Sequence, residues 1–201
     1  MEDPVFEDET CPFTVYGRAQ NARTLLFATK PSLARRISTT RSARWCLILS
    51  KFGILSRATV HAIQLFANAL ALPIGFVGDL DVHDVAAFVA LRRALADSPP
   101  IQRSKLVYAG VSADWIERAE RFLKPGIPLA TISVEERGLE KERWEILQKQ
   151  WPRVRSALGG PTASWLDRGY KVEVEALWNP AIFRPGHFEQ FVRYLVSKAR
   201  P

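Results

Sequence analysis

The chain of 201 residues has few cysteines and no long run of apolar residues. Cys11 and Cys46 are its only cysteines, which is too few for a disulfide framework or a thiolate zinc site, so we expect a reduced, cytoplasmic setting. The acidic start of the sequence lacks the basic residues and the apolar run of a signal peptide. Residues 58–78 carry no charge, but they include polar residues and a proline. A buried helix followed by a strand explains them better than a membrane span, so we expect no membrane partner.

Acidic residues are absent from a long tract of the chain. Residues 10–78 contain nine lysines and arginines and no aspartate or glutamate, whereas residues 1–9 contain five acids and no base. Clustered bases suit contacts with phosphate groups, which attract nucleic acid without reading its sequence. The alternative is a basic surface that only improves solubility. The residues that we predict to bind nucleic acid are Arg35, Arg36, Arg41, Arg44, Lys51 and Arg57. The sequence has no Walker or Gly-x-Gly-x-x-Gly pattern, so it gives no support to a third interpretation, a nucleotide-binding protein.

Short apolar runs alternate with amphipathic segments from residue 24 onwards. The runs that predict strands are residues 24–28, 45–50, 73–78 and 105–109, and the segments that predict helices are residues 31–37, 56–69, 82–96 and 112–122. Ser56 and Ser112 are the expected N-caps of the second and fourth of these helices. The apolar runs are continuous, as is typical of parallel strands that are buried on both faces. We therefore predict an α/β fold, with a Rossmann-like parallel sheet flanked by helices on both faces.

The two ends of the chain differ from this pattern. Residues 1–22 have no sustained periodicity, and we predict a flexible N-terminal arm there, followed by a single α/β domain over residues 23–201. From about residue 129 the strand–helix alternation gives way to a helical and short-strand C-terminal extension. Its expected parts are a short strand at 129–134, a charged helix at 135–150, an alternating segment at 170–177 and a helix at 188–198.

Acidic side chains follow the third predicted strand, where ligands bind in open α/β sheets. This loop contains Asp79, Asp81, His83 and Asp84. Asp79 and Asp81 share one face of an extended segment, as a hard divalent cation such as Mg²⁺ requires of its oxygen ligands. The sequence therefore predicts all four residues as metal ligands, at the end of a basic tract that would hold a polyanion beside the metal. The alternative is that Asp81 or Asp84 caps the next helix.

Several segments resemble one protein family. Phe-Val-Gly-Asp-Leu-Asp-Val-His at residues 76–83 resembles the Asp-x-Asp motif of Toprim domains, in the version found in the A subunit of topoisomerase VI and its meiotic double-strand-break relatives. Four more segments resemble motifs of this family in the same order, at residues 46–59, 110–114, 131–137 and 171–177. The resemblance covers roughly residues 24–195. It implies a Toprim-like fold, a Mg²⁺ cofactor, DNA as partner, and catalytic roles for Asp79 and Asp81.

The sequence departs from this family at a catalytic residue and in the domain that bears the attacking tyrosine. Where the family has a glutamate after its first strand, this chain has Ala28 and Thr29, so the group that would act as general acid/base and metal ligand is missing. The resemblance suggests Glu173 as a catalytic substitute, and His83 as a ligand or proton carrier. The alternative for Glu173 is a surface salt bridge with Lys171. The family's winged-helix domain, which bears the attacking tyrosine, has no counterpart in the residues before the first predicted strand.

Two functions follow from these observations. The first is a Mg²⁺-binding, nucleic-acid-binding subunit whose phosphodiester chemistry needs a protein partner to supply the winged-helix tyrosine or an ATPase. The second is a degenerate Toprim module that serves in protein interaction or assembly and performs no chemistry. The sequence leaves open whether the protein is an enzyme.

Overall fold

A five-stranded sheet forms the centre of the computed structural model, which describes residues 13–51, 55–96, 106–127 and 134–200. The strands are β1 (Thr14–Tyr16), β2 (Thr24–Ala28), β3 (Cys46–Ser50), β4 (Ile74–Val77) and β5 (Leu106–Tyr108). Their order in the sheet is β1-β3-β2-β4-β5, in which β1 is antiparallel to β3 and the other neighbours are parallel. Every residue of β2, β3 and β4 is buried, as the continuous apolar runs predicted. The predicted Rossmann-like α/β fold is confirmed, with one antiparallel edge strand.

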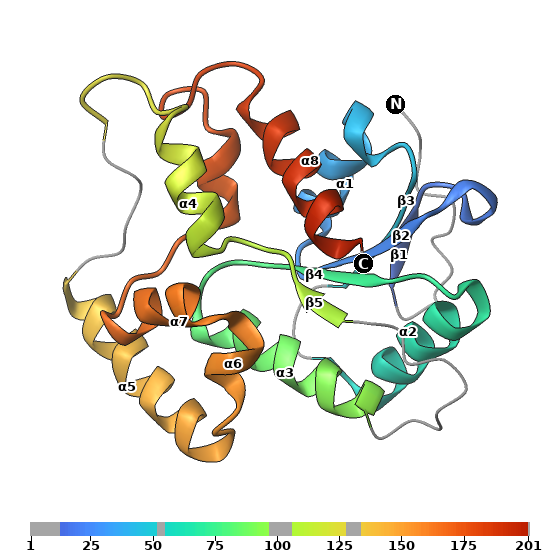
Figure 1. Cartoon of the computed structure of the whole chain (residues 1–201), viewed down its shortest axis with the longest axis horizontal. Helices are drawn as coiled ribbons and strands as arrows, with labels where there is room; N and C mark the ends of the chain where they lie inside the picture. Colours follow the sequence, from blue (N-terminus) through green and yellow to red (C-terminus); the bar gives the residue numbers. More distant parts are fainter. Residues whose placement is uncertain (1–12, 52–54, 97–105, 128–133, 201) are drawn as a thin grey trace.

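Helices cover both faces of the sheet (Figure 1). Helices α1 (Pro31–Ser38) and α8 (His187–Ala199) lie on one face, and α2 (Arg57–Leu70) and α3 (Val82–Ala96) lie on the other. This arrangement follows from the strand order, because right-handed crossovers from β2 to β3 and from β3 to β4 run in opposite directions across the sheet. Residues 58–78 thus form most of α2 and then β4, as predicted. No helix in the described ranges is long and apolar enough to cross a membrane.

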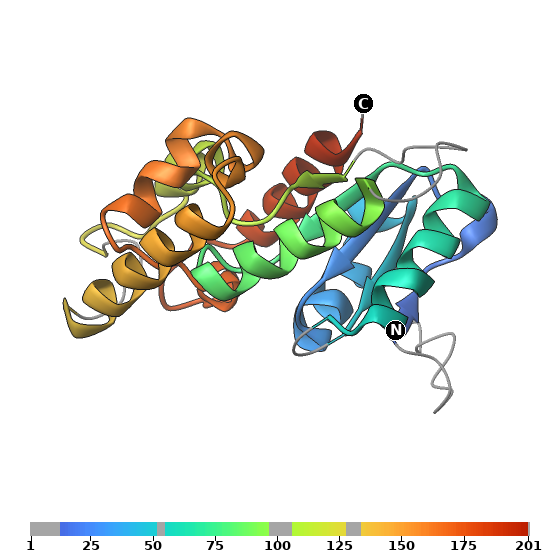
Figure 2. The ribbon, with the colours of Figure 1, turned by 90° about the horizontal axis from the view of Figure 1, so that it is seen from below.

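A group of helices lies beyond α3, to one side of the sheet (Figure 2). Its members are α4 (Ala113–Glu120), α5 (Val134–Gln150), α6 (Val154–Leu158) and α7 (Gly160–Asp167). Trp144 of α5 is completely buried, and its indole N–H donates a hydrogen bond of 2.8 Å to Asp167 of α7. Short 3-10 helices occur at η1 (Ala19–Asn21), η2 (Arg41–Ala43) and η3 (Val174–Trp178).

Of the two predicted serine N-caps, the one at Ser56 is confirmed and the one at Ser112 is wrong. Ser56 caps α2 as expected, because its Oγ accepts a hydrogen bond of 3.2 Å from the Thr59 N–H. Ser112 precedes α4 but makes no side-chain cap. Its Oγ instead lies 2.6 Å from the hydroxyl of Tyr194 on α8. The Ser112 hydroxyl, which we expected to cap α4, therefore contacts α8 instead.

The prediction of a flexible arm over residues 1–22 is wrong for residues 13–16, which are packed onto the sheet. Strand β1 pairs with β3, with Val15 opposite Leu49, and Phe13, Val15 and Tyr16 are buried. A strand of three residues is too short to show a period of two, so the sequence pattern gave no sign of it. Residues 1–12 of the predicted arm lie outside the described residues.

The C-terminal extension also differs in part. The strand expected at 129–134 falls almost entirely outside the described residues, and Val134 begins α5. The alternating segment at 170–177 does not form a strand. It makes one antiparallel bridge, between Val172 and Leu80, and then turns into η3. The predicted charged helix and the final helix are confirmed as α5 and α8.

Candidate functional site

The acidic residues lie where the carboxyl ends of β2 and β4 meet. Ala28 pairs with Val77 in register, and the Thr29 N–H donates a hydrogen bond of 3.1 Å to the Val77 carbonyl. The residues that follow these strands are therefore held side by side. A cavity of about 900 Å³ lies elsewhere on the molecule, and one of about 700 Å³ opens here. The predicted acidic residues line one part of this second cavity, and apolar residues of α3 and α5 line the rest.

Asp79 is buried and fully engaged. Its side chain is 5 % exposed, and its Oδ2 lies 2.8 Å from the Nζ of Lys30. Its Oδ1 accepts a hydrogen bond of 2.8 Å from the Val174 N–H, and its backbone carbonyl accepts one of 2.6 Å from the Tyr108 hydroxyl. Burial raises the pKa of Asp79 above its ordinary value, while the hydrogen bonds from Lys30 and Val174 oppose that rise. Both carboxylate oxygens thus have a donor within the protein.

Asp81 and Asp84 build the start of α3. The Oδ1 of Asp81 accepts a hydrogen bond of 2.8 Å from the Asp84 N–H, so Asp81 has the capping role that was the alternative to metal binding. The Oδ2 of Asp84 accepts hydrogen bonds from the Asp79 N–H at 2.6 Å and from the Thr29 hydroxyl at 2.9 Å. Burial raises the pKa of Asp84 to about 7, and the charges of Asp81 and Asp79 add to the rise. Asp84 is therefore partly protonated at neutral pH.

The raised pKa predicts a pH-dependent effect of Asp84→Asn. A folded-state pKa of about 7, against an ordinary value of 3.8, means that protonation of Asp84 stabilises the fold fully below about pH 4 and loses this effect as the pH rises through 7. Asparagine keeps an acceptor oxygen for the Asp79 and Thr29 donors and cannot ionise. The stability of Asp84→Asn relative to the unmodified protein should therefore rise by up to roughly 1.4 kcal/mol per pH unit between about pH 4 and pH 7. Urea unfolding at about pH 5 and pH 8 measures this change.

Asp167→Asn provides the matched control. The hydrogen bonds from Arg155 and Trp144 outweigh burial and lower the pKa of Asp167. This carboxylate is then ionised in both folded and unfolded chains over the tested range, so the effect of its replacement should not vary with pH there. An equal pH dependence for the two variants would contradict the assignment to Asp84.

Glu175, and not the predicted Glu173, reaches the acidic cluster. Glu173, the predicted catalytic substitute, is 54 % exposed and forms a salt bridge of 3.0 Å with Lys171, which was the alternative interpretation. Glu175 instead reaches the acidic cluster, where its Oε2 lies 2.6 Å from the Nζ of Lys30. Sequence reasoning missed both Lys30 and Glu175. The available signal was Lys30 itself, a cation two residues after the strand that lies beside the one followed by Asp79.

The Mg²⁺ that the resemblance implies does not fit this arrangement. Across the described ranges, no three His, Cys, Asp or Glu side chains converge in a way that would hold a metal ion. The physical reason is that Asp79, Asp81 and Asp84 each accept hydrogen bonds from protein donors, and Lys30 lies against Asp79. His83, the remaining predicted ligand, is exposed on the first turn of α3.

The six predicted nucleic-acid residues do not form one surface. Arg41 and Arg44 lie near the amino ends of β2 and β3, whereas Lys51 follows the carboxyl end of β3 and donates a hydrogen bond of 3.1 Å to Thr59. Arg35 and Arg36 are exposed on α1, and the Arg36 guanidinium is 5.8 Å from the Phe188 ring centroid. Arg57 begins α2, and its side chain lies outside the described residues.

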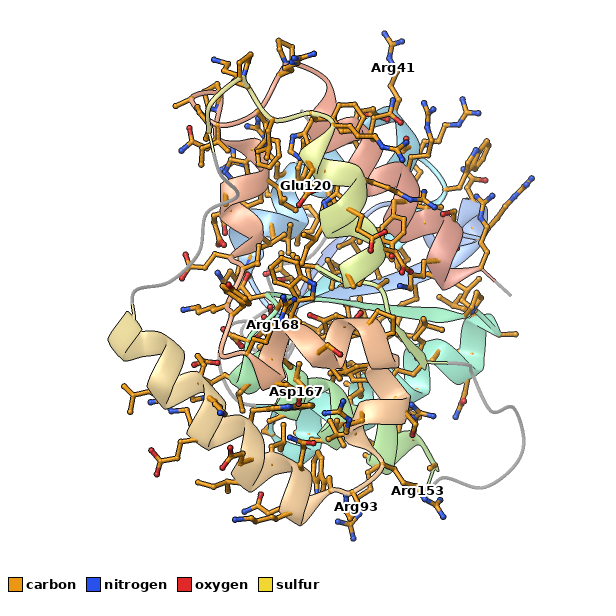
Figure 3. All side chains as sticks on the ribbon, turned by 60° about the vertical axis from the view of Figure 1, so that its left-hand side comes forward. Arg41, Arg93, Glu120, Arg153, Asp167 and Arg168 are labelled. Carbon is orange, nitrogen blue, oxygen red and sulfur yellow. The ribbon has the colours of Figure 1, made fainter. Side chains whose placement is uncertain are left out.

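A different set of arginines surrounds the cavity of about 900 Å³, which we call the arginine groove. Its five arginines are Arg23, Arg41, Arg44, Arg193 and Arg200. All five side chains are exposed, and Arg41 points away from the ribbon into solvent (Figure 3). The groove lies at the opposite ends of the strands from the acidic cluster, roughly 20 Å away along β2 at about 3.3 Å per residue. The arginine groove is therefore separated from the acidic cluster, whereas the sequence analysis expected basic residues and carboxylates to lie side by side.

Trp45 and Glu189 organise this groove. The guanidinium carbons of Arg23 and Arg44 lie 5.3 and 5.2 Å from the Trp45 ring centroid, within cation–π distance. The carboxylate of Glu189 accepts hydrogen bonds from the Arg41 N–H at 3.2 Å and from the Ser42 N–H at 2.8 Å. Among the described residues, Glu189 is the only acidic one that lines the groove, and its carboxylate is thus engaged by the backbone of η2.

No protein-family model matches the chain, and no curated protein has a similar sequence.

Proposed function

We propose that this protein is a nucleic-acid-binding module that resembles a Toprim domain and holds the sugar–phosphate backbone in the arginine groove. The observation that carries the proposal is the charge of the groove, where five exposed arginines face one carboxylate that is already hydrogen-bonded within the protein. Arginine is the preferred partner of phosphate, because its planar guanidinium presents several donors in a fixed arrangement.

The basic surface continues beyond the groove along α8. A second depression of about 570 Å³ shares Arg193 and Ser197 with the groove and adds Arg118 and Arg121, which are exposed on and just after α4. The Arg118 guanidinium carbon lies 5.3 Å from the ring centroid of Tyr194. An extended row of arginines suits a chain of phosphates better than a single small anion. We therefore propose a nucleic-acid strand as the ligand, bound largely without sequence readout.

The same proposal assigns the protein to binding and assembly rather than to strand cleavage. Thr29 stands close to the position where the related family has its catalytic glutamate, and its hydroxyl donates a hydrogen bond to Asp84. A threonine hydroxyl is too weakly acidic and basic to replace a carboxylate in proton transfer at neutral pH. The proposal therefore combines the nucleic-acid binding of the first function that the sequence suggested with the absence of chemistry of the second, and DNA is the first ligand to test.

Binding of fluorescently labelled oligonucleotides, followed by anisotropy over a series of NaCl concentrations, tests this function. We expect measurable affinity for DNA that falls steeply as salt rises, since each neutralised phosphate releases counterions. The double variant Arg44→Ala/Arg193→Ala removes two exposed guanidiniums from the groove. It should weaken binding by about tenfold or more and reduce the slope of log affinity against log salt by about two.

Arg153→Ala serves as the control. Arg153 is also exposed, but it lies near Arg93 on another side of the molecule (Figure 3). Its loss should leave both affinity and slope almost unchanged. Equal losses for the control and the groove variant would show that binding depends on net charge alone and would contradict the proposed groove. Comparison of single-stranded DNA, duplex DNA and RNA of one sequence identifies the preferred ligand.

A further inference from the structure

We infer that the ammonium group of Lys30 is the resident cation of the acidic cluster, so that this protein neutralises the cluster internally and does not bind Mg²⁺ there. The inference concerns the acidic cluster only. It stands or falls separately from the arginine groove, because its tests use no nucleic acid.

The position of Lys30 follows from the backbone. Lys30 is the second residue after β2, and Pro31 occupies the first turn of α1 directly behind it. Its φ of −125° and ψ of 127° keep it extended, so its side chain leaves the sheet at the edge where Asp79 follows β4. The register of β2 against β4 fixes these two residues next to each other. The ammonium is thus placed by the sheet itself.

The distances around Lys30 are those of a group held by two carboxylates. The Nζ atom lies 2.8 Å from Asp79 and 2.6 Å from Glu175, and the side chain is 23 % exposed. A lysine ammonium has three donors and no acceptor, so two carboxylates satisfy most of its hydrogen-bonding capacity. A divalent cation bridging the same two carboxylates would need oxygen distances of about 2.0–2.6 Å and would have to displace Lys30.

Lys30 is protonated, and so positively charged, at neutral pH. Burial lowers its pKa, but the hydrogen bonds and charges of Asp79 and Glu175 outweigh burial, so the net shift is upward. A protonated lysine therefore balances one carboxylate charge at every pH at which the protein is expected to work. Metal binding would have to remove a permanent cation as well as the hydrogen bonds that Asp79 and Asp84 already accept.

Paramagnetic broadening of backbone amide NMR signals by Mn²⁺, used as the probe for a divalent site, tests the inference directly. In the unmodified protein we expect no selective broadening of the signals of residues 79–84 and 174. Lys30→Met keeps an unbranched side chain that is one atom shorter and removes the charge. In this variant we expect selective broadening at these residues, with an apparent Mn²⁺ affinity at least about tenfold higher. Selective broadening in the unmodified protein would overturn the inference, whether or not Lys30→Met folds.

Lys171→Met is the matched control. Lys171 also forms a salt bridge with a glutamate at the rim of the site, at 3.0 Å from Glu173, but it is not placed between Asp79 and a second carboxylate. Its replacement should create no selective Mn²⁺ broadening. Equal broadening in the two variants would show that any loss of positive charge admits the metal, and this result would also contradict the specific role of Lys30.

Thermal unfolding with MgCl₂, compared with NaCl at the same ionic strength, gives a second measurement. The melting temperature of the unmodified protein should not differ between the two salts. That of Lys30→Met should be higher in MgCl₂, and Asp79→Asn in the same background should abolish the difference. Nicking of supercoiled plasmid in MgCl₂ that Asp79→Asn abolishes would overturn the inference, because it would place a functional metal at this cluster.

Discussion

Gly110→Ala should destabilise the fold by about 3 kcal/mol or more, through overpacking of backbone against backbone. A Cβ atom on Gly110 would lie 2.5 Å from the carbonyl oxygen of Gly78 and 2.8 Å from its nitrogen, closer than real Cβ atoms come. Neither backbone atom can move alone, because the Val111 N–H donates a hydrogen bond of 3.3 Å to the same Gly78 carbonyl. The segments after β4 and β5 would have to separate, and Asp79 would move with them.

Gly138→Ala is the control, because it makes the same substitution at a glycine that has no close neighbour. Gly138 is exposed within α5, and a Cβ atom there would meet nothing within 4 Å. Alanine is the better helix former, so this variant should gain about 0.5–1 kcal/mol of stability. Urea unfolding of the two variants should thus give effects of opposite sign. A loss of similar size in both would show that the close approach at Gly110 is not the cause.

Phe76→Ala should reduce the free energy of unfolding by about 3–5 kcal/mol. Phe76 lies on β4, between β2 and β5 in the sheet, and is completely buried. Its ring centroid is 5.7 Å from that of Phe27, 5.6 Å from that of Phe88 and 6.1 Å from that of Tyr108. Truncation leaves a cavity that these aromatic rings cannot fill, since they are fixed by β2, α3 and β5. Urea unfolding, with near-UV circular dichroism to follow aromatic packing, measures the loss.

Leu65→Ala supplies the comparison for Phe76. Leu65 is a large apolar residue of α2 that is 56 % exposed, so its truncation should change stability by no more than about 0.5 kcal/mol. Comparable losses at the two sites would contradict the assignment of the aromatic cluster as the centre of the core.

The sequence predicted those helices and strands whose apolar residues follow a clear pattern over the whole element. Strands β2 to β4 stood out because each is buried on both faces and therefore consists of an uninterrupted apolar run. Helix α2 stood out through its cap at Ser56. Strand β1 was missed because its three residues show no period, and because its place is decided by the free edge of β3 rather than by its own composition. Helices α6 and α7 are short and follow one another directly, so they too lacked a readable period.

The candidate site was predictable in location but not in chemistry. The rule that ligands bind beyond the carboxyl ends of parallel strands placed Asp79, Asp81 and Asp84 together. Which partners these carboxylates choose depends on contacts between distant segments, such as the pairing of Lys30 with Glu175, which are 145 residues apart. The arginine groove was predicted only in part for the same reason, because Arg41 and Arg44 alone of its five arginines were expected to bind nucleic acid. Arg193 and Arg200 reach the groove from α8 and its vicinity.

The distance along the chain between Lys30 and Glu175 also affects the order in which the protein folds during synthesis. One face of the sheet is covered in part by α8, and the resident cation gains its second carboxylate from Glu175, so both are incomplete while the ribosome is still translating the C-terminal quarter of this sequence. Until then β2 and β4 present apolar side chains that the finished structure buries completely. This face of the sheet and the acidic cluster are therefore expected to be completed late, after the segment from Glu175 through α8 has been made.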